Sequence, residues 1–181
     1  MLFASRKYKT GSKWAFWRWT DVMLNDELYL RRLHLAMVPR MGAIMLHWIK
    51  KADPQPHLHD HPVNFLSIPL WGWYTEERIS TPYDPMCRLE VIKLNDGLFT
   101  RAIYEKTVRW ANFVRAQTPH RIVALPPGGV LTLVFASPKV REWEFWTERG
   151  KIGWKDYDLK KEIELKGASN VATTPGVPNN V

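Results

Sequence analysis

The chain has 181 residues, of which 45% are hydrophobic and 24% charged, a composition that suits one globular domain and excludes a fibrous or wholly disordered chain. Lysine and arginine number 26 against 18 acidic residues, and the formal net charge of +8 permits an anionic partner, although a basic surface also serves solubility. The single cysteine, Cys87, excludes an internal disulfide and a cysteine-based zinc site.

No apolar run reaches the roughly 20 residues that a membrane helix needs. Residues 1–13 are basic and lack the apolar stretch and cleavage site of a secretory signal. We therefore expect a cytoplasmic protein with no membrane contact.

The N-terminal region is ambiguous. Residues 13–19 interleave tryptophans with basic residues, which is typical of single-stranded nucleic-acid binding, or of a strand that packs on a barrel. Residues 21–33 have acidic groups early and arginines late, as a helix favours, but residues 28–35 also suit a strand, which we expect for the second half. We expect residues 1–27 to form an extension that packs on the main domain, and most of the ten tryptophans to lie in or beside the core.

The middle of the chain predicts short β-strands. Apolar or alternating runs bounded by turn residues occur at residues 40–49, 64–71, 89–94, 110–115, 122–125, 130–136 and 141–146. Thirteen prolines suit the corners and edges of an all-β domain better than a helical bundle. We expect an all-β domain over residues 28–166 with little helix, followed by a flexible tail at residues 167–181, which is rich in Asn, Pro, Thr and Gly.

Three of the six histidines lie within residues 57–61. On a strand, His59 and His61 share one face and can bind one cation, and Pro62 favours an extended conformation at His61. A stable site needs a third ligand, for which His120 is the best candidate, since it precedes another apolar run. The alternative is a solvated polar loop.

This pattern resembles the first motif of the cupin superfamily, in which His-x-His is followed by a glutamate and then by a turn glycine, here Gly72, while His120 matches the later histidine. Over residues 28–157 the chain is similar to small single-domain cupin-like proteins of bacteria and bacteriophages, on motifs at residues 58–62, 65–67, 71–76, 119–122 and 138–143. The resemblance implies a jelly-roll, or double-stranded β-helix barrel, with a divalent metal ion in its mouth. For a phage protein the compartment would be the host cytoplasm.

One departure from that pattern affects the ligand set. Phe65 or its neighbours stand where the family has a carboxylate ligand, and we expect Phe65 to line the substrate pocket. The resemblance then implies a three-histidine centre like that of thiol dioxygenases. Fe(II) is expected for a dioxygenase acting on a small anionic molecule, such as a nucleotide, whereas Zn, Ni or Mn would suit other chemistry. A further possibility is that the metal has been lost.

Other residues are candidates for the surroundings of the metal. Tyr74 is a candidate proton donor or acid, and Arg115 and Arg121 are candidates for substrate binding in catalysis, with surface ion pairs as the alternative for the arginines. His47 and His57 are candidates for lining the substrate pocket, with plain burial as the alternative for His47.

Two other functional classes remain open at this stage. The barrel can hold a small ligand without turnover, or the basic chain can bind nucleic acid. A homodimer is also expected from the exposed strand edges and aromatic residues.

Overall fold

The computed structural model describes residues 15–24, 26–80, 88–94, 97–147, 149–158, 161 and 163–164. These residues form thirteen strands: β1 Ala15–Leu24, β2 Glu27–Val38, β3 Gly42–Ile49, β4 Leu58–His59, β5 Phe65–Trp71, β6 Tyr74–Ser80, β7 Arg88–Leu94, β8 Gly97–Val108, β9 Asn112–Val114, β10 His120–Ala124, β11 Val130–Ala136, β12 Glu144–Thr147 and β13 Gly150–Gly153. The predicted tail at residues 167–181 lies outside the described residues.

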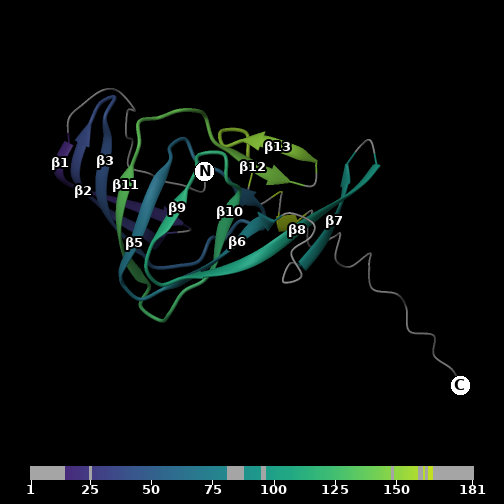
Figure 1. The fold of residues 1–181 in the computed structure, drawn as a ribbon, viewed down its shortest axis with the longest axis horizontal. Helices are drawn as coiled ribbons and strands as arrows, with labels where there is room; N and C mark the ends of the chain where they lie inside the picture. The colour runs from purple at the N-terminus through teal and green to yellow at the C-terminus, as the bar shows by residue number, and fades with distance from the viewer. Residues whose placement is uncertain are drawn as a thin grey trace, which may run out of the picture.

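The strands form two antiparallel sheets (Figure 1). One has six strands in the order β1-β2-β3-β11-β5-β9, and the other has seven in the order β13-β12-β4-β10-β6-β8-β7. Between β3 and β6, and again between β8 and β12, each strand lies in the opposite sheet from the one before it. Chain crossings of this kind define a jelly-roll, so the all-β, cupin-like jelly-roll prediction is confirmed.

The N-terminal strand is part of the six-stranded sheet. β1 pairs with β2 from Ala15↔Met37 to Leu24↔Glu27, so residues 15–24 of the predicted extension form an edge strand. The helical alternative for residues 21–33 is wrong, because the described part of this segment is strand and the two strands exchange ladder hydrogen bonds. In the part of the chain described, no helix is long and apolar enough to cross a membrane.

Strands β6 and β8 were not predicted from the sequence, and in β6 the reason is that charged residues outnumber aliphatic ones. In β6, Tyr74, Glu76 and Arg78 share one face and are all buried, so polar side chains take the inward positions that apolar residues usually occupy. An alternation of apolar residues therefore gives no signal there.

Gly72 makes the turn between β5 and β6, as predicted. Its φ of +79° lies in the left-handed region, and a Cβ would meet the carbonyl oxygen of Gly129 at 3.1 Å, so a side chain would be both strained and crowded. Next to this turn, Tyr74, Val108 and Val130 form a buried cluster against which Ile122 and Leu125 pack. Because Val130 lies on β11, this cluster fixes the first residues of β6 against the six-stranded sheet.

The tryptophans are less buried than predicted. Six of the tryptophans that the structure describes are exposed, among them Trp19 on β1, Trp48 on β3 and Trp71 on β5. These three strands belong to the same sheet, whose other face lines the interior. The proposed homodimer and the nucleic-acid partner stay predictions.

Candidate metal centre

Strand pairing places two of the predicted histidines side by side. β4 is only two residues long, and in it His59 pairs directly with His120 of β10 on one side and with Phe145 of β12 on the other. His61 follows β4, where its backbone N–H donates to the carbonyl oxygen of Ala116 at 2.9 Å. Residues separated by 59 positions are thus brought together by one antiparallel pairing and one loop contact.

The three histidines form one cluster. One ring nitrogen of each of His59, His61 and His120 lies within 4.8 Å of those of the other two. The Nε2 atoms of His61 and His120 are 2.7 Å apart, and the ring of His59 lies 5.1 Å from that of His61 and 5.4 Å from that of His120, centre to centre. Two nitrogens bound to one tetrahedral cation lie about 3.3 Å apart, so the cluster fits a cation after a small separation of His61 and His120.

Glu76 orients His120. His120 Nδ1 donates to Glu76 Oε2 at 2.9 Å, which in the neutral ring leaves the lone pair of Nε2 facing the other histidines. The Glu76 side chain is fully buried, and its other oxygen accepts from Arg78 Nε at 2.6 Å and from Asn112 Nδ2 at 3.0 Å. Burial alone would raise the pKa of Glu76, but hydrogen bonds and positive charge from His120 and Arg78 outweigh it and lower the pKa.

Gln55 lies beside His59. The two side chains meet at 3.2 Å between Gln55 Nε2 and His59 Nδ1, while the buried Oε1 of Gln55 has no hydrogen-bond partner among the described residues. Turning the amide over would let His59 Nδ1–H donate to Oε1. Nε2 of His59 would then carry a lone pair that can bind a metal ion. The unpartnered Oε1 of Gln55 is the acceptor that this tautomer of His59 requires.

Two of the three rings, those of His59 and His61, are held in the neutral form. Burial lowers the pKa of His59 to about 4 and that of His61 well below its usual value, and in His61 the neighbouring charges of His120 and His59 add to this effect. Neutral imidazole is the form that binds a metal ion, so these rings need not lose a proton to do so near pH 7.

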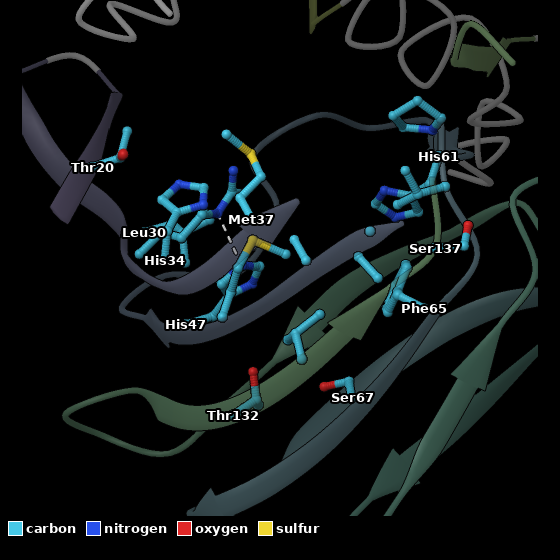
Figure 2. A pocket seen from close by; sticks show the side chains of 18 of the residues that line it. Thr20, Leu30, His34, Met37, His47, His61, Phe65, Ser67, Thr132 and Ser137 are labelled. Atoms are coloured by element: carbon cyan, nitrogen blue, oxygen red, sulfur yellow. Dashed lines mark hydrogen bonds between the residues drawn. The ribbon is translucent and has the colours of Figure 1, made fainter. Parts of the chain in front are cut away.

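The cluster lies at one end of a cavity of about 630 Å³ between the two sheets. Figure 2 shows His61 and Phe65 together on one side of the cavity, and His34 and His47 on the other. The Phe65 ring lies 4.9 Å from that of His61 and 6.2 Å from that of His120, and so it covers the cluster with an apolar surface at the position where the resemblance expected a carboxylate. The volume is that of a typical small-molecule site.

Tyr74 and His47, two of the other predicted residues, line this cavity. The Tyr74 hydroxyl accepts from Asn112 Nδ2 at 3.0 Å, and burial first, then the charge of Glu76, raise the pKa of Tyr74 to about 12, so the phenol keeps its proton. His47 Nε2 accepts from Arg32 Nε at 2.9 Å.

The remaining three predicted residues do not line the cavity. His57 is buried, with its Nδ1 3.0 Å from the hydroxyl of Tyr157. Arg121 has the opposite parity to His120 on β10, and its Nε donates to Glu77 Oε2 at 2.6 Å, which is the ion pair stated as the alternative. Arg115 is exposed. Geometry gives the catalytic roles of these arginines no support, because β-strand alternation turns Arg121 outward.

Asp60 faces away from the histidines that flank it. Its fully buried carboxylate accepts from Arg141 Nη1 at 2.7 Å, from the backbone N–H of Glu144 at 2.8 Å and from Trp146 Nε1 at 3.2 Å. Asp60 therefore ties β4 to β12 and fixes the backbone between His59 and His61, which positions both rings without touching either.

Sequence reasoning did not identify Glu76 or Gln55. The available signal for Glu76 was a run of charged residues, Glu76 to Arg78, between a turn glycine, Gly72, and the proline-containing turn residues at 81–85. A buried strand with alternating charged residues points to a polar network inside the protein.

The fold is that of a cupin-like β-barrel, and its three clustered histidines are a group that can hold a metal ion. No protein-family model and no curated protein matches the chain. Similar solved structures include one described as Fe(II) HppE, with a TM-score of 0.41 and 12% identity, covering 72% of this chain and 58% of the HppE chain.

Two further solved structures are similar to the chain. An RmlC-like cupin from Shewanella frigidimarina has a TM-score of 0.35 and 16% identity, covering 76% of this chain and 95% of its own. Oxalate decarboxylase from Bacillus subtilis has a TM-score of 0.39 and 14% identity, covering 97% of this chain and 39% of its own. At these identities the likeness concerns the fold alone, so any function must be argued from this chain's own residues.

Proposed function

We propose that this protein is a metal-dependent cupin enzyme, with His59, His61 and His120 as ligands of one divalent ion, and that it acts on a small anionic molecule in the cavity between the sheets. The observation that carries the proposal is the convergence of the three ring nitrogens within 4.8 Å at one end of that cavity. Fe(II) is the proposed ion, because a neutral ligand set suits oxygen chemistry on an anionic substrate, and Zn, Ni and Mn are the alternatives.

When bound, a divalent ion supplies Lewis-acid activation, and Fe(II) also supplies redox chemistry with dioxygen. The protein's own part is positioning. Glu76 holds His120 in one tautomer, Asp60 fixes the backbone of the His59–His61 segment, and Phe65 excludes water from the cluster. Tyr74 stays protonated and can donate its hydrogen to a ligand oxygen in the cavity.

The test is the metal content of protein purified without a histidine tag. Element-resolved analysis after incubation with Fe(II), Ni(II) or Zn(II) should give about one ion per chain for the wild type and less than about 0.1 for a His59→Ala, His61→Ala double variant. His57→Gln is the matched control, since His57 is adjacent in sequence but its ring bonds Tyr157 outside the cavity. Wild-type protein that gains no ion in any of the three metals would disprove the proposal.

One observation favours a second candidate, a binding module without turnover. His61 and His120 are already within hydrogen-bond distance of each other, so the cluster can persist without an ion and the cavity can still hold a ligand. The same metal measurement separates the two, because a structural histidine cluster would bind no ion stoichiometrically.

A further inference from the structure

A row of polar side chains crosses the inner face of the six-stranded sheet. Thr20, Arg32, His47 and Thr132 occupy neighbouring strands β1, β2, β3 and β11, and the register pairs them in sequence: Thr20 with Arg32, Arg32 with His47, and His47 with Thr132. All four line the cavity, and Arg32 Nε donates to His47 Nε2 at 2.9 Å, the bond drawn as a dashed line at His47 in Figure 2. We call these four residues the polar row.

The polar row is distant from the histidine cluster. Ala136, four residues beyond Thr132 on β11, pairs with Phe65, whose ring covers His61 and His120. Four residues of strand span about 13 Å. Between the two levels, Met45 and Val134 are paired neighbours that also line the cavity. The cavity therefore has a polar end, an apolar middle and a histidine end.

The polar row contains hydrogen-bonding groups that the protein leaves unused. Thr132 is fully buried, and among the described residues neither its Oγ1 nor that of Thr20 has a hydrogen-bond partner. A buried hydroxyl without a partner destabilises the protein, because it has lost its bonds to water and gained none. Two such groups, one at each end of a row that contains an arginine, are the arrangement expected where a ligand's oxygen atoms complete the bonding.

The charge of the cavity favours an anion. Arg32, Arg40 and Lys139 line it, whereas among the described residues Asp53 is the only carboxylate that does so. Asp53 is already used, because it accepts from the Tyr29 hydroxyl and from the backbone N–H of Ile122. Arg32 places a guanidinium on the cavity wall, and its positive charge attracts a carboxylate or a phosphate.

We propose that the polar row is an anion subsite, and that the cavity takes an elongated molecule with an acid group at the row, an apolar middle over Met45 and Val134, and a metal-binding oxygen group at the histidine cluster. This inference rests on the proposed function, because the second end of the molecule needs the ion. It narrows the substrate class from small anions in general to acids with polar groups at both ends.

The test uses Co(II) as the ion, because its visible spectrum reports on its ligands. Full-length protein is first titrated with Co(II), and the Co(II) protein is then titrated by calorimetry with succinate, adipate, suberate and sebacate. The monocarboxylates of the same chain lengths are the matched probes. We expect a dicarboxylate of intermediate length to bind at least about tenfold more tightly than its monocarboxylate, and to change the Co(II) spectrum.

Two variants assign the effect to the row. Arg32→Gln should remove the preference for dicarboxylates, a loss of at least about tenfold, while leaving Co(II) affinity within about threefold. Thr132→Val keeps the shape, removes a hydroxyl that has no protein partner, and should weaken dicarboxylate binding about three- to tenfold without loss of folding. Arg109→Gln is the control, because Arg109 is exposed over Trp73 and outside the cavity lining.

The outcomes are distinct. A wild-type protein that binds neither Co(II) nor any of Fe(II), Ni(II) and Zn(II) overturns the proposed function and this inference with it. If it binds one of those three ions but not Co(II), both acid series are titrated with that ion. A protein that binds Co(II) but shows equal affinity for both acid series at every length overturns the inference alone. If Arg32→Gln does not fold, Thr132→Val decides, and unchanged dicarboxylate affinity in that variant also overturns the inference.

Discussion

The histidine cluster and the polar row lie in one cavity but differ in how their polar groups are satisfied. At the cluster, His120 is bonded to Glu76, and Glu76 to Arg78 and Asn112, so the polar side chains support one another. At the polar row, Arg32 bonds His47, but the hydroxyls of Thr20 and Thr132 have no partner among the described residues. The hydrogen bonds that support His120 are complete within the protein, whereas those of the polar row would be completed by the ligand that we propose.

The two regions also differ in their backbone. The polar row lies on four adjacent strands, and their register places its four side chains next to one another. The cluster lies on a two-residue strand and the loop after it, and Asp60 ties that segment to β12. A regular sheet suits recognition of an extended group, whereas a short anchored segment suits convergence of rings on one point.

The largest expected effect is a loss of stability, and it tests whether the polar side chains behind the histidine cluster depend on one another. Glu76→Ala removes the only carboxylate that the described residues place against Arg78 and His120, so a buried charge is left without its partner. We expect the free energy of unfolding to fall by about 3–5 kcal/mol, measured by urea denaturation at pH 7. Glu77→Gln, which removes a carboxylate paired outside the cavity, should cost less. Equal losses of stability in both variants would mean that the hydrogen-bonded network behind the histidine cluster stabilises the fold no more than an ion pair outside the cavity does.

The conservative change at the same position separates stability from metal binding. Glu76→Gln keeps the shape and hydrogen-bonding capacity but removes the charge that fixes the His120 tautomer. We expect metal affinity to fall about 10- to 100-fold, measured by competition with a chelator of known affinity. An affinity within twofold of the wild type would show that Glu76 supports the fold without tuning the histidine.

The sequence predicted the ligands better than their surroundings. Strand alternation predicted that His59 and His61 point the same way, and their rings do converge, although His61 lies in the loop after β4 and not on a strand. The third histidine, His120, followed from its position before another apolar run and from the cupin resemblance. Its pairing with His59 could not be derived, because register between distant strands depends on the whole topology.

The hydrogen bonds that support the three histidines could not be predicted from the sequence for the same reason. Glu76 meets His120 across the β6–β10 pairing, and Asn112 reaches Glu76 from the opposite sheet. Polar residues on an inward face also break the apolar alternation by which strands are predicted, so β6 was missed together with its function. The apolar strands β5 and β11, by contrast, were predicted almost to the residue.

A pH titration tests how far the stability of the protein depends on a neutral His34 at the polar end of the cavity. Burial first, and then the charges of Arg32 and Arg18, lower the pKa of His34 to about 4. The unfolded chain therefore binds a proton near pH 6.5, whereas the folded chain binds it only near pH 4. The stability that depends on neutral His34 is fully present above about pH 6.5 and is lost as the pH falls toward 4. At pH 5 we expect the wild type to lose about 1–2 kcal/mol more than His34→Gln, relative to pH 8. Parallel stability curves for the two proteins would contradict this assignment.

The smallest expected effect addresses the unused hydroxyl of the polar row directly. Thr132→Val replaces a fully buried hydroxyl that lacks a partner among the described residues with a methyl group of similar size. Without a ligand, the variant should be more stable than the wild type by about 1 kcal/mol in urea denaturation, since the penalty for burying the hydroxyl is removed. With a bound dicarboxylate the order should reverse, because only the wild type gains the ligand's hydrogen bond. A threonine that stabilises the ligand-free protein would mean that the hydroxyl is already satisfied, and the two regions of the cavity would then be alike.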